Sequence, residues 1–161
     1  MYSRIIQLET TPIPESDYIT AADYDYEHWF LREIADFVDE DEDREATLHF
    51  FLDFLSRSDD SLDRFPDGFA LKPGFHARYF SPDYARFRAV LDSISSSLTL
   101  DSFVGGSGLG GELFALRDAY EDEFTYYVQT TEHNLLPLAR FLRLAKPGTR
   151  YYFGGTLSYH W

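Results

Sequence analysis

The chain has 161 residues, 44% of them hydrophobic and 18% aromatic, with no cysteine and a formal net charge of −14. This length suits one globular domain, residues 1–161, and the apolar content is large enough to offset the entropy of folding, which excludes a wholly disordered chain. The lack of cysteine excludes disulfides, thiolate nucleophiles, iron–sulfur clusters and cysteine zinc sites. An acidic pI of about 4.5 disfavours direct binding to nucleic acid or to an anionic membrane.

The N-terminal residues predict no targeting segment. They lack the apolar core of a signal peptide and become acidic at Glu9. No apolar run along the chain is long enough to span a bilayer. We therefore expect a cytoplasmic protein.

The first 68 residues carry the patterns of a strand, two helices and a loop. An apolar run around Ile5 favours an opening strand, and apolar residues at helical spacing then predict two helices. Thr20 with Asp23, or Asp25 just before Tyr26, is placed to cap the first helix, and Asp43 or a neighbour to cap the second. The predicted elements are a strand at 3–10, a helix at 26–38, an acidic turn at 39–43, a helix at 44–57 and a loop at 56–68, with a candidate domain boundary near 58–68.

The rest of the chain alternates between strand and helix patterns. Ser81-Pro82-Asp83 has the composition of a helix start, and heptad-spaced apolar residues follow it up to Leu98. Gly154-Gly155 lies between two β-rich runs, which is typical of a hairpin turn. The predicted elements are one or two strands at 69–80, a helix at 81–98, a strand at 98–104, a glycine-rich loop at 105–111, a helix at 112–121, a strand at 124–130, a helix at 135–146 and a hairpin at 149–161.

This order of elements predicts the fold class. Strands and helices alternate without the repeating βαβ period of a parallel sheet, and several strands show the alternation of half-exposed antiparallel strands. We expect a single mixed α+β domain with a largely antiparallel sheet, four to five helices and a C-terminal β-hairpin.

A glycine-rich loop matches the dinucleotide-binding fingerprint in form. Gly106, Gly108 and Gly111 fit G-x-G-x-x-G, and Glu132 follows about 20 residues later. The preceding residues lack the continuous apolar run of a buried parallel strand, and too little chain follows for a Rossmann sheet. A flexible turn is the simpler interpretation, with a nucleotide or small-ligand site as the alternative.

One helix face offers a candidate metal site. Glu45, His49 and Asp53 recur at every fourth position, so they share a face that could hold a divalent cation or an acid–base pair. The same spacing arises on the solvated face of any amphipathic helix. The other histidines are scattered, and no nucleophile elbow or phosphate-binding loop is present. We predict no catalytic residue and no cofactor.

Negative charge is concentrated in one segment. Residues 9–67 hold 19 carboxylates and four basic residues, a net charge of −15, whereas the rest of the chain sums to +1. Seven carboxylates fall within ten residues, roughly one per 2 Å if helical, against one per ~1.7 Å in duplex DNA. They are Asp36, Asp39, Glu40, Asp41, Glu42, Asp43 and Glu45.

The acidic segment supports the leading functional hypothesis. We expect a non-catalytic interaction or regulatory protein that binds a basic protein partner through these carboxylates, in the manner of a DNA mimic. This inference is drawn from charge, since no motif of known DNA mimics occurs. A small-ligand protein or enzyme using residues 105–111 is the first alternative. A protein whose acidity serves only solubility is the second. Homo-oligomerisation stays open.

Overall fold

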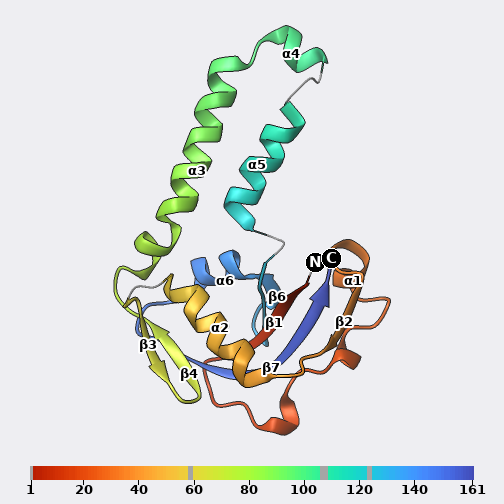
Figure 1. Ribbon diagram of the computed structural model, residues 1–161, viewed down its shortest axis with the longest axis vertical. Helices are drawn as coiled ribbons and strands as arrows, with labels where there is room; N and C mark the ends of the chain where they lie inside the picture. Colours follow the sequence, from red (N-terminus) through yellow and green to blue (C-terminus); the bar gives the residue numbers. More distant parts are fainter. Residues whose placement is uncertain (1, 58–59, 106–108, 123–124) are drawn as a thin grey trace.

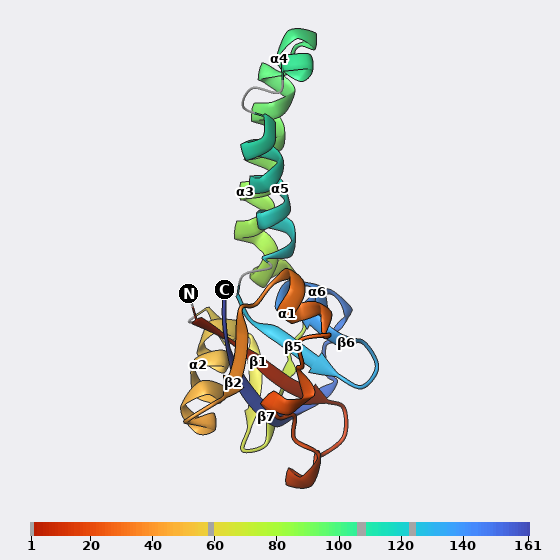
Figure 2. The same cartoon turned by 90° about the vertical axis from the view of Figure 1, so that its right-hand side faces the viewer.

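The computed structural model describes residues 2–57, 60–105, 109–122 and 125–161. It has a body built on one β-sheet and an arm of two long helices that projects from the body (Figures 1 and 2). The helices are α1 Trp29–Glu33, α2 Arg44–Ser56, α3 Phe75–Ser97, α4 Leu100–Gly105, α5 Leu109–Glu121 and α6 Leu138–Leu144, with 3-10 helices η1 Glu15–Asp17 and η2 Ala21–Asp23. The strands are β1 Tyr2–Glu9, β2 Phe37–Glu40, β3 Leu62–Phe65, β4 Gly68–Leu71, β5 Tyr127–Thr130, β6 Asn134–Pro137 and β7 Arg150–His160.

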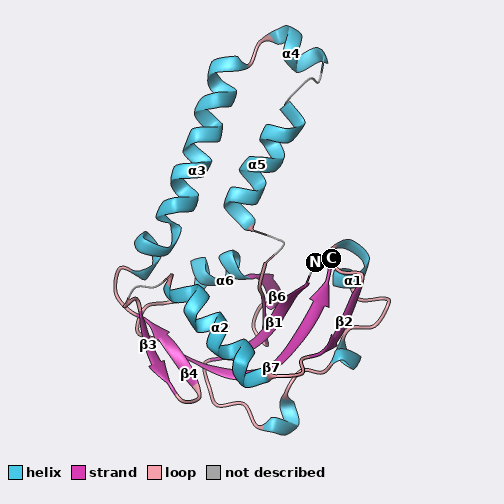
Figure 3. Cartoon of the chain, in the orientation of Figure 1, coloured by secondary structure: helices cyan, strands magenta, loops and turns pink. Residues whose placement is uncertain are grey.

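The long strand β7 organises the sheet. The strand order is β3-β4-β7-β1-β5-β6, and β2 also pairs with β7. β7 pairs antiparallel with β1 on one edge, and on its other edge with β4 near its start and β2 near its end. β1 and β5 run parallel, and the other described pairs are antiparallel. The predicted α+β class with a largely antiparallel sheet is confirmed (Figure 3).

The β1–β7 pairing contains a bulge at the two glycines of β7. Ile6 lies opposite Thr156 and Leu8 lies opposite Phe153, so Gly154 and Gly155 together oppose the single residue between Ile6 and Leu8. A bulge of this kind shifts the alternation of side chains by one residue. In the first half of β7 the alternate apolar side chains therefore point to one face of the sheet. In the second half they point to the opposite face.

Each face of the sheet carries its own apolar cluster. One cluster joins the sheet to α2, α6 and the first turns of α3, with Phe51 and Phe75 fully buried. The other lies under α1 and the chain around Tyr24, with Phe30 in edge-to-face contact with Tyr127 and Tyr159. Tyr151 and Phe153 belong to the first cluster, whereas Leu157 and Tyr159 belong to the second, as the bulge requires.

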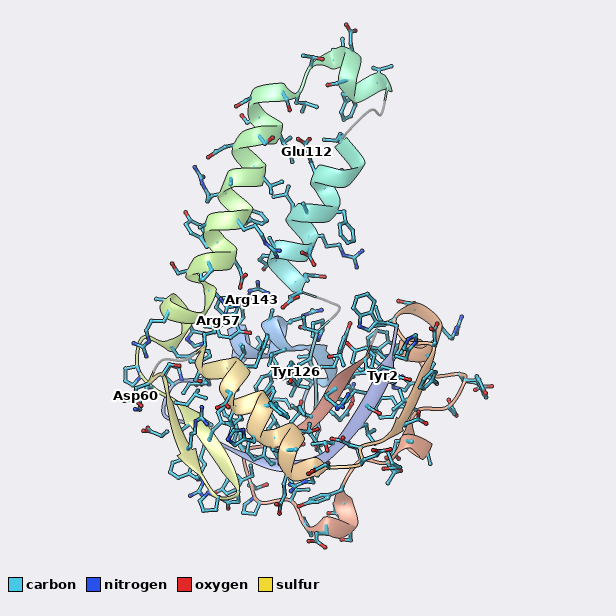
Figure 4. All side chains as sticks on the ribbon, viewed as in Figure 1. Tyr2, Arg57, Asp60, Glu112, Tyr126 and Arg143 are labelled. Atoms are coloured by element: carbon cyan, nitrogen blue, oxygen red, sulfur yellow. The ribbon has the colours of Figure 1, made fainter. Side chains whose placement is uncertain are left out.

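Two arginines of the body hold the base of the arm (Figure 4). The guanidinium of Arg57 lies over the ring of Tyr79 at 4.3 Å and pairs with Asp83 at 3.0 Å. The guanidinium of Arg143 lies 3.9 Å from the ring centre of Tyr120 and donates to its carbonyl oxygen. Cation–π contacts of this kind add to apolar packing. One contact thus fixes α3 and the other fixes α5.

The first half of the chain confirms some predictions and corrects others. The opening strand and α2 form as expected, and the Asp43 side chain caps α2 by accepting from the Ala46 amide at 3.0 Å. The helix predicted at 26–38 is limited to α1, because residues 37–40 pair with β7 as β2. The acidic turn at 39–43 thus begins inside a strand, and the loop at 56–68 contains β3, with residues 58–59 outside the described residues.

The helix predicted at 81–98 begins earlier than its sequence signal suggests. α3 starts at Phe75, directly after Gly74, whose positive φ of 82° suits glycine, so Pro82 lies inside the helix. Of the predicted strands at 69–80, only β4 forms. The strand predicted at 98–104 is wrong, because Leu100–Gly105 is the helix α4.

The last third of the chain is corrected at two places. The helix predicted at 135–146 is split, because Asn134–Pro137 pairs with β5 as β6 and only Leu138–Leu144 is helical. Residues 149–161 contain strand as predicted, but Gly154-Gly155 does not form a turn: the two β-rich runs are one strand, β7. The helix at 112–121 is confirmed as α5 and the strand at 124–130 as β5, with residue 124 outside the described residues. No helix in the described ranges has the length and apolar character needed to cross a membrane.

A matched pair of glycine substitutions tests the sheet. A Cβ at Gly68 would lie 1.9 Å from the main-chain oxygen of Tyr151, so Gly68→Ala must disturb the β4–β7 pairing. We expect a loss of about 2–3 kcal/mol in the free energy of unfolding. A Cβ at Gly111 in α5 meets open space, so Gly111→Ala should add about 0.5 kcal/mol. Urea unfolding measures both changes, and equal effects would contradict the described pairing.

Buried tyrosines predict a loss of stability at alkaline pH. Burial raises the pKa of Tyr79 to about 12, partly offset by Arg57, and burial also raises the pKa of Tyr24 and Tyr159. The folded state therefore holds these protons more tightly than the unfolded chain, whose tyrosines titrate near pH 10. Stability should be complete below about pH 10 and fall as the pH rises towards 12.

Unfolding free energies at a series of alkaline pH values test this expectation. Tyr79→Phe should make the fall with pH shallower than in the wild type. Tyr26→Phe is the control, because Tyr26 is 91% exposed. A wild-type protein whose stability does not change above about pH 10 would contradict the burial of these phenols.

Candidate functional site

The structure distributes the seven predicted partner-binding carboxylates over a strand, a turn and a helix start. Asp39 and Glu40 lie on β2, which forms an edge of the sheet beside the end of β7, and Asp36 directly precedes it. The turn that follows leads into α2, whose first turn carries Glu45. Figure 2 shows the backbone of this segment running along β2 and then turning into α2.

Four of these carboxylates make contacts within the protein. The aspartate at position 41 is the most deeply placed, with a side chain only 5% exposed. Their partners are the His160 ring nitrogen for Asp36 at 3.0 Å, the Ala21 amide for Glu40 at 2.8 Å, the Thr156 hydroxyl for Asp41 at 2.7 Å with the Arg4 guanidinium at 3.6 Å, and the Ala46 amide for Asp43 at 3.0 Å. These four carboxylates therefore hold the segment in place, and their internal contacts limit their availability to a partner protein.

The other three carboxylates face solvent. Asp39, Glu42 and Glu45 are exposed, and none has a hydrogen-bond or ion-pair partner within the described part of the chain. The basic residue inside the segment, Arg44, is turned inward: its Nε donates to the Gly154 carbonyl at 2.7 Å and its guanidinium lies over the Tyr18 ring. Arg44 therefore fills the gap between β4 and β2 on the edge of β7 and leaves the outward charge of the segment uniformly negative.

The candidate metal ligands lie on one helix face but do not converge. Glu45, His49 and Asp53 are all exposed on α2, and Asp53 is shared between His49 at 3.3 Å and the guanidinium of Arg64 at 2.9 Å. An arginine on a ligand carboxylate competes with a cation for the same oxygen atoms. The described residues contain no group of three side chains arranged to hold a metal ion.

The described residues on either side of the predicted glycine-rich loop, Gly105 at the end of α4 and Leu109 at the start of α5, lie at the far end of the arm, away from the body (Figure 1). Gly106 and Gly108 fall outside the described residues, and Gly111 lies in the first turn of α5. The element before the loop is the helix α4, whereas the nucleotide fingerprint requires a strand there. The nucleotide hypothesis thus lacks the strand–loop–helix context on which it depends and stays a prediction.

A small cavity of about 270 Å³ opens where the parallel strands β1 and β5 end. Its lining includes Glu9, His133, Lys146 and Tyr151. Glu9 accepts from the amide and hydroxyl of Thr131 at 2.6 and 2.7 Å. Burial raises the pKa of Tyr151, which keeps its phenol protonated. The Tyr151 phenol accepts from the Lys146 amide at 3.1 Å, and His133 lies 3.7 Å from Glu132, so the described lining shows no nucleophile–base contact.

The arm presents a surface that our sequence-based predictions did not include. Apolar side chains are strongly exposed along it and at its tip, where Leu100, Phe103 and Val104 of α4 are 63–77% exposed. The heptad spacing along α3 predicts a helix but does not say what its apolar side chains contact. The additional signal in the sequence is that residues 89–116 contain no lysine or arginine. Large apolar patches of this kind mark interaction sites.

Comparison with known proteins provides no relative. No known protein family matches the sequence, and neither a curated protein nor a solved structure matches the chain.

Alanine substitutions separate structural from exposed carboxylates. Asp41→Ala leaves the Thr156 hydroxyl and the Arg4 guanidinium without their acceptor, and we expect a loss of about 1–3 kcal/mol in the free energy of unfolding. Glu42→Ala, one residue away and exposed, should change it by less than about 0.5 kcal/mol. Thermal and urea unfolding measure both. Equal destabilisation by the two variants would show that the segment is not divided in this way.

Proposed function

We propose that the protein is a non-catalytic interaction protein that binds a basic protein partner through the acidic segment, residues 36–45. The observation that carries the proposal is the arrangement of Asp39, Glu42 and Glu45: all three are exposed, and none is neutralised within the described part of the chain. The neighbouring carboxylates fix the strand, turn and helix on which these three lie. Carboxylates held in place in this way meet a partner at little further cost in conformational entropy.

Two features of the surroundings favour the same conclusion. Arg44 is held by main-chain carbonyls of β7, so it does not offset the charge of its neighbours at the surface. β2 is an edge strand, and charged side chains there discourage pairing with other strands. The segment is thus suited to contacts through side-chain charge and not through strand addition.

The chemistry of such a surface defines its partner. Uniform negative charge attracts arginine- and lysine-rich surfaces, steers their approach and discriminates against acidic proteins. Grooves that bind the closely spaced phosphates of nucleic acid are basic surfaces of this type. The finer form of the proposal is therefore that the segment occupies such a groove in place of DNA.

Charge-matched triple variants test this proposal. The first variant, Asp39→Asn with Glu42→Gln and Glu45→Gln, removes the three free carboxylates and leaves the four structural ones. The second, Asp63→Asn with Asp101→Asn and Glu132→Gln, removes the same charge from β3, α4 and the β5–β6 turn. Immobilised proteins are incubated with lysate of the source cell, and a retained basic protein is purified and titrated. We expect at least about tenfold weaker binding by the first variant alone, because each lost charge contact contributes about 0.5–1 kcal/mol.

Salt and competition complete the test. Binding to the wild type should weaken steeply between about 50 and 300 mM salt. Duplex DNA should displace the protein if the partner's nucleic-acid groove is occupied. Equal weakening by both variants would show that binding depends only on the net charge of the protein and not on the acidic segment, which would contradict the proposal. The absence of any retained basic protein would leave solubility as the role of the acidic segment and would overturn the proposal.

A further inference from the structure

The arm is an antiparallel helical hairpin with one polar side. Near the body, Arg86 of α3 pairs with Asp118 of α5 at 3.1 Å, and towards the tip Ser93 donates to Glu112 at 3.3 Å. Figure 4 shows Glu112 on the distal part of α5, where it lies towards α3. These contacts run along the same side of the hairpin. They define its polar side.

Both helices of the arm carry a heptad pattern that the hairpin satisfies only in part. Apolar residues alternate at spacings of four and three on each helix, which is the pattern of a helix that packs on two neighbours. On α3 they are Phe80, Tyr84, Phe87, Leu91, Ile94 and Leu98, and on α5 Leu109, Leu113, Leu116 and Tyr120. Every second residue in these lists is partly covered, namely Phe80, Phe87 and Ile94 of α3 and Leu109 and Leu116 of α5. The residues between them are exposed.

The exposed set is large on both helices. Tyr84, Leu91 and Leu98 are 65%, 39% and 45% exposed. Leu113 and Tyr120 of α5 are 53% and 52% exposed. Tyr120 lies at the body end of this exposed set, where its ring contacts Phe87 at 6.3 Å and the Arg143 guanidinium at 3.9 Å, so only part of its ring faces solvent.

The exposed residues of both helices lie on the same face of the hairpin. Helical residues two positions apart point about 160° apart, so Tyr84 and Leu91 point away from the side marked by Arg86 and Ser93. On α5, Tyr120 and Leu113 point about 140–160° away from Asp118 by the same geometry. Because Arg86 pairs with Asp118, both apolar sets must lie on the opposite, shared face.

The rim of this apolar face is charge-balanced. Along α3 it is bordered by Arg88 and Asp92, which pair at 3.6 Å, and along α5 by Arg117 and Glu121, which pair at 3.8 Å. Each border thus offers one base and one acid at corresponding positions beside the apolar set. Because each acid is already paired with a base on its own helix, each border is neutral, and a second copy of the same face meets no net charge repulsion there.

We propose that this arm face, the surface of Tyr84, Leu91, Leu98, Leu113 and Tyr120, is a dimerisation surface that packs against the same face of a second copy of the chain. The product is a four-helix arrangement with two-fold symmetry. Most of the negative charge lies in residues 9–67, in the body. An antiparallel arrangement of the two arms keeps the bodies at opposite ends and therefore avoids repulsion between them. The inference is independent of the basic partner proposed above.

The face is the size of a weak, reversible interface. Residues 84–98 span about 21 Å, and two helices are about 20 Å wide, which gives about 420 Å² of projected area on each copy. This is roughly half of the 800 Å² that a standard interface buries per partner, before the apolar tip is added. We therefore expect a reversible dimer with a dissociation constant of about 10–100 μM.

Sedimentation equilibrium between about 1 and 500 μM tests the proposal. The wild-type mass should rise from the monomer value of 18.7 kDa towards twice that value. Leu91→Lys with Leu113→Lys should remain monomeric at every concentration. The control, Ser96→Lys with Phe114→Lys, adds the same charge to the other sides of the arm and replaces an apolar residue that is 60% exposed, so it should dimerise as the wild type does. Circular dichroism checks that both variants keep their helices.

Several results would overturn the proposal. A wild-type protein that stays monomeric at the highest concentration would mean that another partner, or none, covers this face. Equal loss of dimer in the control variant, or growth beyond the dimer mass, would indicate unspecific association of exposed apolar groups.

Spin labels test the orientation. The chain has no cysteine, so Ser95→Cys on the arm and Glu132→Cys on the body can each carry one label. Antiparallel arms predict a shorter label-to-label distance at position 95 than at position 132. The reverse order would contradict the antiparallel dimer.

Discussion

The bulge at Gly154 and Gly155 is the constraint on which the rest of the body depends. The side chain of Gln7 fills the space beside it: its Oε1 accepts from the amides of Gly155 at 2.8 Å and Ile19 at 3.0 Å, and its Nε2 donates to the Asp17 carbonyl at 2.9 Å. A Cβ at Gly154 would lie 2.3 Å from the Gln7 oxygen. The two glycines therefore admit a buried amide that attaches the chain around residues 17–19 to the centre of the sheet.

The acidic surface follows from this constraint. Because the bulge lies between the parts of β7 that pair with β4 and β2, two carbonyl groups remain on that edge, and Arg44 donates to both. The same bulge brings Thr156 to the position where it binds Asp41. Arg44 and Asp41 thus fix the start of α2 and the end of β2, and Asp39, Glu42 and Glu45 beside them face outward. Internal hydrogen bonds of the neighbouring residues therefore hold these three carboxylates at the surface.

Local signals in the sequence predicted the elements that depend on local interactions. Asp43 and the apolar spacing after it define α2, and the opening run around Ile5 defines β1, because each signal lies within the element itself. β2 needs the edge of β7, more than 100 residues away, and Gly154-Gly155 resembles a turn unless Gln7 is known to lie beside it. The same limit applies to the candidate site: the internal partners of Glu40, Asp41 and Asp36 are 19, 115 and 124 residues distant, so the sequence could not separate structural from free carboxylates.

The acidic segment and the arm face would bind through different physical forces, so experiments that vary salt can distinguish their effects. An interface formed by exposed carboxylates weakens as salt screens the charges. Burial of apolar side chains on the arm is not weakened in this way, and excluded salts such as sulfate strengthen it. If both surfaces act, pairing of the arms joins two acidic bodies in one particle, so that a partner with two basic sites binds more tightly without any new contact. The separation of charge in the body from apolar surface on the arm is thus a physical basis for assembling a bivalent acidic protein.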